Sequence, residues 1–407
     1  MLYQFNNDMK QIITHFTDND LYTFTCQYYI LQKYPRAEVE YTFFDRNKTK
    51  YPKGFDKLLR EQIDLMSNVK ITKEEIDFFK RKCNFLPIWY VENFLKGYTF
   101  NPNEVFISQD EEGYLDVRAK GKWYSTIMWE MPVLSIISEL MHDINGDYDN
   151  YNWKNEVDKN AAKIKAILNN GGFRLADMGT RRRFSFEHQD KVLNLFSDAQ
   201  RNNPDSVGKF TGTSNVYFAM KYDLTPIGTM SHQIISFEEN VSGVFECNYN
   251  VMNKWSEVYD GNNGIYLYDC FGDNVFFNNM SRRMAMLYSG LRVDSGNEEE
   301  QIAKIVDKYT QLGIDATQKQ VVFSNGLDLN RAFQIHEHSR NKIKDSYGIG
   351  TFITCDVDNV KPMNIVFKLT KCRITESREW HDCVKLSCTK GKTLGNEDKC
   401  KYLLSVC

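Results

Sequence analysis

The middle of the chain repeats one pattern of apolar and polar positions. At residues 291–293 apolar and charged side chains alternate, which predicts the end of a β-strand. Residues 294–296, Asp-Ser-Gly, predict a turn. Three acidic residues beginning at Glu298 and apolar residues at helical spacing then predict a helix that ends near Gly313. The repeated unit is therefore a strand, a polar turn and a helix. The purely structural interpretation of its turn is an ordinary helix N-terminus capped by Asp294 or Ser295.

Similar polar turns recur along the middle of the chain, each after a short apolar run. There are seven of them, at 176–181, 210–215, 227–232, 268–272, 293–296, 323–326 and 347–350. Helices are expected at 161–168, 192–196 and 328–336, and alternation of strands with helices predicts a parallel sheet. Seven turns at the carboxyl ends of strands favour an irregular TIM-like β/α barrel with its chemistry on that face. An open doubly wound sheet is the alternative, but it would gather the polar turns near one switch point.

The two ends of the chain contain a different pattern, in which every second residue is apolar. Val39, Tyr41 and Phe43 alternate with polar residues, and residues 363–369 do the same. Two such strands predict one sheet assembled from both chain ends. We therefore expect an additional α/β sandwich domain at 1–140, the barrel at 141–358, and a C-terminal segment at 359–407 that packs with the N-terminal domain.

Composition narrows the class of protein. The 407 residues are 42% hydrophobic and 26% charged with a formal charge of −3, which gives no basic field for nucleic acid. No apolar run approaches the roughly 18 residues needed to span a membrane. Residues 1–8 lack the features of a signal peptide, so a cytoplasmic protein is expected, without nucleic acid or membrane as a partner.

The cysteines suggest reduced thiols rather than a disulfide framework. Ten are scattered along the chain without a C-x-x-C pair. The densest patch contains Cys372, His381, Cys383, Cys388 and Cys400. Its spacings match no closed structural zinc site, so zinc is not expected there.

Pooled on one rim, the seven turns offer chemistry suited to a phosphorylated sugar. They supply His232, Asp269, Asp294, Arg292 and the run 181–183, together with backbone amides beside glycine. Amides at helix starts and Arg side chains bind phosphate, and acids among them hold Mg²⁺ or sugar hydroxyls. A run of arginines is usually a solvated face, so only Arg181 is expected to contact a ligand. The remaining histidines have no motif support and are expected to be structural: His15, His142, His188, His336, His338 and His381.

Ordered motifs along nearly the whole chain resemble those of nicotinate phosphoribosyltransferases, a type II phosphoribosyltransferase family. They are Leu21-Tyr22, Gly179-Thr180-Arg181-Arg182-Arg183-Phe184-Ser185, Gly212-Thr213-Ser214-Asn215-Val216, Pro226-Ile227-Gly228-Thr229-Met230-Ser231-His232, Asp269-Cys270-Phe271-Gly272, Leu291-Arg292-Val293-Asp294-Ser295-Gly296, Phe323-Ser324-Asn325-Gly326-Leu327-Asp328, Gly348-Ile349-Gly350-Thr351, Lys361-Pro362-Met363-Asn364-Ile365-Val366 and Gly391-Lys392-Thr393.

The resemblance implies a reaction: nicotinate and phosphoribosyl pyrophosphate give nicotinate mononucleotide and pyrophosphate, with coupled ATP hydrolysis and Mg²⁺. It implies a homodimer in which a partner's N-terminal segment completes each site. It also implies roles for individual residues: His232 as the histidine phosphorylated by ATP, Asp269 and Asp294 near ribose and Mg²⁺, Arg292 at pyrophosphate, Ser324, Asn325, Gly348 and Gly350 at the 5′-phosphate, Arg181 and Met178 at the pyridine, Tyr22 as the partner's aromatic residue, and Thr213, Ser214, Ser295 and Gly296 as further substrate contacts.

Two residues depart from the family pattern. Asn325 stands where many members have Asp, and Met178 stands where relatives usually have a Phe that stacks on the pyridine. Residues 210–222 contain no acid, whereas nicotinamide-using relatives place an Asp there, so we predict a preference for nicotinate. A nicotinamide phosphoribosyltransferase and a non-catalytic phosphoribosyl-binding barrel are the alternatives. The presence of His232, Asp269 and Asp294 favours the enzyme.

Overall fold

A curled sheet of seven parallel strands forms the larger part of the molecule. The computed structural model describes residues 10–149, 151–386 and 393–407. The strand order is β6-β5-β4-β10-β9-β8-β7, so the first strand of the sheet in sequence pairs with the last. The strands are β4 (Arg174–Asp177), β5 (Lys209–Thr213), β6 (Thr225–Pro226), β7 (Ile265–Leu267), β8 (Gly290–Val293), β9 (Gln320–Phe323) and β10 (Lys344–Ile349).

This cyclic order confirms the barrel and excludes the doubly wound sheet, because neighbours in sequence are neighbours in the sheet. The edges β6 and β7 face one opening. There the hydroxyl of Thr229 donates to the carbonyl of Ile265 at 2.7 Å. All seven predicted turns begin at or within the carboxyl ends of these strands.

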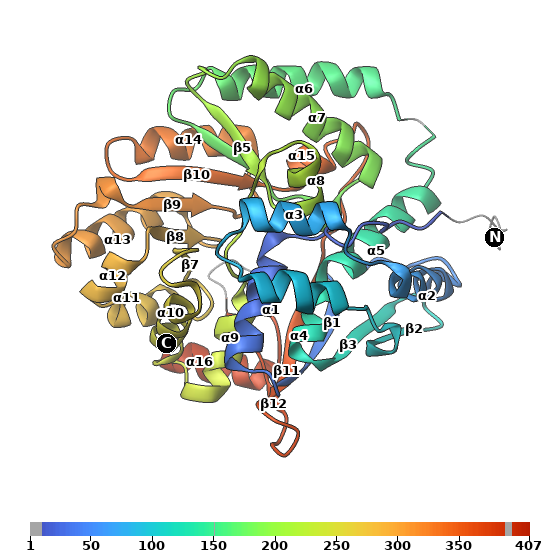
Figure 1. Ribbon diagram of the computed structural model, residues 1–407, viewed down its shortest axis with the longest axis horizontal. Coiled ribbons are helices and arrows are strands. Elements are labelled where there is room, and N and C mark those ends of the chain that lie inside the picture. Colours follow the sequence, from blue (N-terminus) through green and yellow to red (C-terminus); the bar gives the residue numbers. More distant parts are fainter. Residues whose placement is uncertain (1–9, 150, 387–392) are drawn as a thin grey trace.

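Helices follow the strands and cover the outside of the barrel (Figure 1). The unit around β8 forms as the sequence predicts, except that Asn297 caps α13, accepting from the amide of Glu300 at 3.0 Å. Gly313 lies just beyond the end of α13 with φ +67°, a conformation that glycine adopts without strain. The helices of the barrel are α6 (Trp153–Leu168), α7 (Phe186–Asn202), α8 (Val216–Lys221), α9 (His232–Ser242), α10 (Cys247–Tyr259), α11 (Asp273–Asn279), α12 (Arg282–Leu287), α13 (Glu298–Gln311), α14 (Leu329–Ser339) and α15 (Thr351–Thr354).

The second sheet is antiparallel and is built from both chain ends, as predicted. Its order is β12-β11-β1-β3-β2, and Phe43 of β1 lies opposite Phe367 of β11. The strands are β1 (Glu38–Asp45), β2 (Val105–Gln109), β3 (Leu115–Lys122), β11 (Ile365–Arg373) and β12 (His381–Asp382). The accompanying helices are α1 (Leu21–Lys33), α2 (Phe55–Leu65), α3 (Lys73–Lys82), α4 (Trp123–Thr126), α5 (Glu130–Ile144) and α16 (Glu397–Val406).

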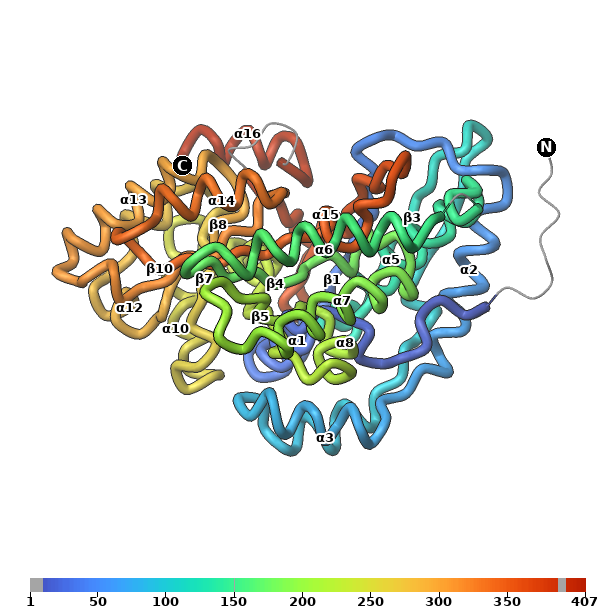
Figure 2. The backbone as a smooth tube through the Cα atoms, turned by 90° about the horizontal axis from the view of Figure 1, so that it is seen from above, coloured from blue at the N-terminus to red at the C-terminus, as the bar shows by residue number. Residues whose placement is uncertain are grey.

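Helix α1 lies between this sheet and the barrel (Figures 1 and 2). Its first amide, that of Leu21, donates to the carbonyl of Ser214 at 2.8 Å, and the hydroxyl of Thr25 donates to the carbonyl of Thr229 at 2.5 Å. These bonds hold the start of α1 against the turns that follow β5 and β6. Within the described residues, no helix has both the length and the apolar composition to cross a lipid bilayer.

Candidate active site at the barrel rim

A cavity of about 850 Å³ opens at the carboxyl ends of the barrel strands, where the antiparallel sheet approaches the rim. Both sheets contribute to its wall, because Arg46 follows β1 and Val366 belongs to β11. Of the site residues predicted from sequence, nine line this cavity: Tyr22, Met178, Arg181, His232, Arg292, Asp294, Ser324, Gly348 and Gly350.

His232 is the first residue of α9 and lies against two carboxylates. Its Nε2 is 2.8 Å from Oδ1 of Asp269 and 3.8 Å from Oδ2 of Asp294. Burial, and then the charge of Lys385, lower the pKa of His232 to about 4. The neutral imidazole therefore donates its Nε2 proton to Asp269, which leaves the lone pair on Nδ1.

The two carboxylates differ in what surrounds them. Asp269 does not line the cavity: one oxygen faces His232 and the other accepts from the hydroxyl of Ser295 at 2.5 Å. Asp294 lines it and accepts from the hydroxyl of Ser324 at 3.0 Å. Burial alone would raise both pKa values, but Lys385 and His232 outweigh it. They lower the pKa of Asp294 to about 2 and that of Asp269 well below its usual value. Both acids are therefore ionised at neutral pH.

These three residues are also a candidate metal site. Among the described residues, they are the one group of three or more His, Cys, Asp or Glu whose ligand atoms all lie within 4.8 Å of one another. Mg²⁺ prefers oxygen ligands and keeps several waters, so Asp294, which lines the cavity, fits it better than Asp269, which does not. The residues fit a Mg²⁺ held through Asp294, with Asp269 orienting the histidine.

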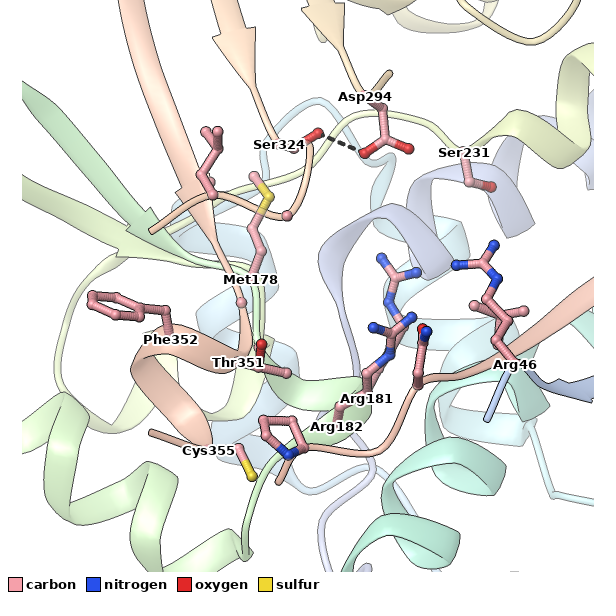
Figure 3. Close-up of a pocket in the computed structure, with 18 of the residues that line it drawn as sticks. Arg46, Met178, Arg181, Arg182, Ser231, Asp294, Ser324, Thr351, Phe352 and Cys355 are labelled. Carbon is pink, nitrogen blue, oxygen red and sulfur yellow. Dashed lines mark hydrogen bonds between the residues drawn. The ribbon is translucent and has the colours of Figure 1, made fainter. Parts of the chain in front are cut away.

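Three guanidinium groups converge on the opposite wall, below Asp294 in Figure 3. They belong to Arg46, Arg181 and Arg182, and none of them forms an ion pair with a carboxylate of the described residues at 4 Å or less. Burial, followed by repulsion from Arg181 and Arg46, lowers the pKa of Arg182 to about 10. Positive charges held together without carboxylate partners are suited to a multivalent anion.

Sequence reasoning missed four of the cations on this cavity wall: Arg46, Arg182, Lys368 and Lys385. Arg181 and Arg182 both line the cavity, and the expectation that Arg181 alone of the run 181–183 contacts a ligand stays a prediction. The run is not a solvated face. Arg183 is fully buried, with Asp18 at 2.7 and 2.8 Å and Glu139 at 2.7 Å, so its charge is used within the fold.

Five further predicted site residues lie behind the cavity wall rather than on it. Their positions are defined by hydrogen bonds within the protein: the hydroxyl of Thr213 donates to Asp177 at 2.7 Å, that of Ser214 to Asp20 at 2.7 Å and that of Ser295 to Asp269, while Asn325 donates to the carbonyl of Gly296 at 3.4 Å. Together with Asp269, these residues support the rim. They do not line the cavity themselves, and their contact with a substrate stays a prediction.

Tyr22 and Met178 both line the cavity of their own chain. Tyr22 is brought there by α1 of the same chain, and the partner subunit's contribution of an aromatic residue stays a prediction. Met178 is half-buried and packs on Gly348, where an added Cβ would overlap with the methionine sulfur. The absence of a side chain at position 348 is therefore what makes room for Met178.

Several other histidines have structural partners, as expected. His336 contacts Asp345 through Nδ1 at 2.8 Å and the carbonyl of Gly171 through Nε2 at 2.9 Å. His142 contacts Asp147, and His188 contacts the hydroxyl of Tyr151. In the cysteine patch near the C-terminus, Cys388 lies outside the described residues.

The fold and the site together define a β/α barrel with a cationic cavity at its rim. Comparison with known proteins makes this specific. The nicotinate phosphoribosyltransferase family model matches residues 173–403, and the model of that family's N-terminal domain matches residues 17–138. The chain belongs to the nicotinate phosphoribosyltransferase family.

Relatives and solved structures agree over nearly the whole length. A nicotinate phosphoribosyltransferase of Desulforapulum autotrophicum is 39% identical, with 97% of this chain and 99% of that protein covered. One of Methanosarcina acetivorans is 35% identical, with 95% and 96% covered. The crystal structure of the nicotinate phosphoribosyltransferase from Porphyromonas gingivalis superimposes with a TM-score of 0.91 at 37% identity, covering 97% of this chain and 99% of the other.

Proposed function

We propose that this chain transfers the phosphoribosyl group of phosphoribosyl pyrophosphate to nicotinate, forming nicotinate mononucleotide and pyrophosphate for NAD salvage in the cytoplasm. The observation that carries the proposal is the arrangement of one cavity. Three guanidinium groups without carboxylate partners face the ionised Asp294 across a space of about 850 Å³. The anionic end of such a substrate matches the three guanidinium groups, and the positive charge that develops at its reacting carbon matches Asp294.

In the transfer step, the pyridine nitrogen forms a bond to the anomeric carbon of the ribose as the bond from that carbon to pyrophosphate breaks. Positive charge develops on the ribose, and the carboxylate of Asp294 stabilises it. Arg46 and Arg182 bind the pyrophosphate as it leaves with the bonding electrons, while Arg181 is kept for the carboxylate of nicotinate. Mg²⁺, when bound at Asp294, supplies further neutralisation of that pyrophosphate.

The other polar groups of the rim position the sugar phosphate. Arg292 is held by Ser324 at 3.0 Å and by the carbonyl of Met230 at 3.3 Å, so its guanidinium is fixed at the cavity. Backbone next to Gly348 and Gly350 approaches the same space and suits the 5′-phosphate. Asn325 contributes indirectly, by bonding to the carbonyl of Gly296 in the turn after β8.

ATP coupling is assigned to His232. Its Nδ1 lone pair forms a bond to the γ-phosphorus of ATP while the bond to the bridging oxygen breaks, and ADP leaves. Asp269 retains the hydrogen bond to Nε2 and stabilises the positive charge that develops on the ring. Water later attacks the phosphorus, the N–P bond breaks, and phosphate is released, so the net change is ATP hydrolysis.

The pyridine is placed beside Tyr22, Met178 and Arg181. Burial opposes the charge on Arg181, but Tyr22, Glu130 and Asp20 together raise its pKa above the usual value, so it stays cationic. A permanent cation there favours the nicotinate carboxylate over the neutral amide of nicotinamide. The proposal includes a homodimer in which the partner's N-terminal segment completes each site, next to Tyr22 of the same chain.

The test uses radiolabelled nicotinate and nicotinamide with phosphoribosyl pyrophosphate and Mg²⁺, with and without ATP. We expect nicotinate mononucleotide to form, faster with ATP, and nicotinamide to react at least 100-fold less well in kcat/KM. Asp294→Asn should reduce the transfer rate, while the matched change Asp328→Asn, at another acid of the cavity wall, should matter less. Comparable kcat/KM values for the two bases would contradict the proposed specificity.

A further inference from the structure

One cation of the site, Lys385, has no role in the transfer of the ribosyl group as described above. Lys385 follows β12, and its Nζ lies 3.5 Å from Oδ2 of Asp294 and 3.9 Å from Oδ2 of Asp269. Both acids flank His232. Lys385 lines the large cavity and also a second space of about 30 Å³ that shares His232 with it. The lysine therefore lies next to the imidazole rather than on the wall of three arginines.

The backbone around Lys385 is fixed on both sides. The amide of Lys385 donates to the carbonyl of Leu394 at 3.0 Å, and the reverse bond has the same length. The amide of Leu386 donates to the carbonyl of Cys270, the residue after Asp269, at 3.0 Å. The carbonyl of Val384 accepts from the hydroxyl of Ser236 in α9, the helix that begins at His232. These bonds tie the lysine to both elements that carry the His–Asp pair.

The positive charge of Lys385 lies where a phosphoryl group would otherwise meet only negative charge. A γ-phosphoryl group that approaches His232 must come close to the ionised Asp269 and Asp294, and both repel it. Lys385 already contacts both acids, and its ammonium carries three donors for phosphate oxygens. Lys368, the other lysine shared by the two cavities, is paired with Glu130 at 3.0 Å and is not placed between these acids.

We propose that Lys385 binds the γ-phosphoryl group of ATP as it moves to His232 and then pairs with the phosphohistidine. This inference rests on the ATP coupling proposed above. In the step, the N–P bond forms at Nδ1, the bond from phosphorus to the ADP oxygen breaks, and ADP leaves with the electron pair. Lys385 moves from its hydrogen bond to Asp294 and its ion pair with Asp269 to the phosphoryl oxygens, and no proton is transferred in this move.

The experiment compares Lys385→Met, Lys385→Arg and the matched control Lys371→Met, which removes an exposed lysine of β11 away from both cavities. Single-turnover incorporation of acid-labile label from γ-labelled ATP is measured first. We expect a rate about 100-fold lower in Lys385→Met, partial recovery in Lys385→Arg, and no change in Lys371→Met.

A second measurement separates contact with the phosphoryl group from a structural role. Binding of ADP and of a β,γ-imido analogue of ATP is measured by calorimetry. Lys385→Met should weaken the analogue at least tenfold and ADP less than threefold, because only the analogue carries a γ-phosphoryl group. Equal weakening of both nucleotides, or an unchanged labelling rate, would overturn the inference. Absence of label in the unmodified protein would instead refute the phosphohistidine itself.

Discussion

The two ends of the barrel each contain a buried histidine paired with an aspartate at 2.8 Å, yet they differ in what remains available. At the amino-terminal end, His336 bonds to Asp345 through one ring nitrogen and to the carbonyl of Gly171 through the other. At the carboxyl-terminal end, Nε2 of His232 bonds to Asp269, and Nδ1 has no hydrogen-bond partner among the described residues. The pair alone therefore does not identify a reactive histidine. A reactive histidine is identified instead by a ring nitrogen that has no hydrogen-bond partner and lies beside a cavity.

The same distinction applies to the arginines of one short run. Arg183 makes three short contacts to Asp18 and Glu139, whereas the one hydrogen bond of the adjacent Arg182 side chain to the described residues runs from Nε to the carbonyl of Ile365. Burying a charge is costly unless it is paired. Arg182 and its neighbours bear that cost in the cavity, which is reasonable where an anionic substrate provides the missing charge. In this molecule, the buried groups that we assign to function are those whose charge or hydrogen-bonding atoms are not fully paired within the protein.

Removing the two histidines in turn provides the largest test of this comparison. His232→Ala should lose all acid-labile labelling from γ-labelled ATP, because the nucleophilic nitrogen is gone, while slow transfer without ATP survives. His336→Ala should label normally when folded, but its unfolding free energy should fall by about 3 kcal/mol, since Asp345 loses a buried partner. Urea unfolding accompanies the labelling assay. Label retained in His232→Ala would place the phosphoryl acceptor elsewhere.

The arginine pair sharpens the comparison with a smaller effect. Arg183→Met leaves two buried carboxylates unpaired and should lower the unfolding free energy by about 3–5 kcal/mol. Arg182→Met should change stability by less than about 1 kcal/mol, yet raise the KM for phosphoribosyl pyrophosphate about 10- to 100-fold, the range expected when a charged hydrogen bond is lost. Steady-state kinetics gives the KM of both variants, and urea unfolding gives their unfolding free energies. A large stability loss in Arg182→Met would make it a structural residue like Arg183.

The features that could be predicted from sequence are those that depend on nearby residues. Each unit of strand, turn and helix is a short continuous segment, such as residues 290–311, so its apolar period and turn residues determine it locally. Asp294 and Arg292 follow from one such unit, and His232 from another. The sequence could not separate residues that face the cavity from those that support it. Thr213 and Asn325 occupy the same kind of turn as Ser324, but of the three only Ser324 lines the cavity.

Arg46 and Lys385 could not be found because they reach the site through distant pairing. Arg46 follows β1, which lies beside β11 more than 300 residues later in sequence. Lys385 depends on bonds from its own segment to Cys270 and to α9. Alternating strands show that a sheet forms, but they do not specify which strand pairs with which. A charged residue at the end of such a strand carries no local sign of where it will lie.

A third histidine, His188, extends the comparison to the effect of low pH on stability. It is structural, and its Nε2 has no partner among the described residues and lies away from the cavity. Burial, and then nearby lysines, lower its pKa to about 3, below the unfolded value near 6.5. The folded state therefore resists protonation, and the stability gained from keeping the ring neutral is lost as pH falls below about 6. We expect His188→Gln to reduce the pH dependence of the unfolding free energy by about 1.4 kcal/mol per pH unit between pH 6 and 4. Urea unfolding at several pH values measures it, and parallel curves for the variant and the parent would refute it.

The smallest expected effect concerns the contact between Met178 and Gly348 at the cavity wall. A Cβ at position 348 would overlap with the sulfur of Met178, which is the movable end of a flexible side chain. Gly348→Ala should therefore push Met178 into the space proposed for the pyridine and raise the KM for nicotinate about fivefold, equivalent to about 1 kcal/mol. Stability should change little, because the side chain can move toward the cavity.

The double variant Gly348→Ala with Met178→Ala provides the control for that interpretation. Removing the long side chain relieves the overlap, so the KM for nicotinate should fall back toward the value of Met178→Ala alone, and the two effects should not add. If the effects of the two substitutions add instead, Gly348 acts through its own approach to the 5′-phosphate and not through Met178. The KM for phosphoribosyl pyrophosphate distinguishes these cases, because a lost phosphate contact raises that KM whether or not the methionine is present.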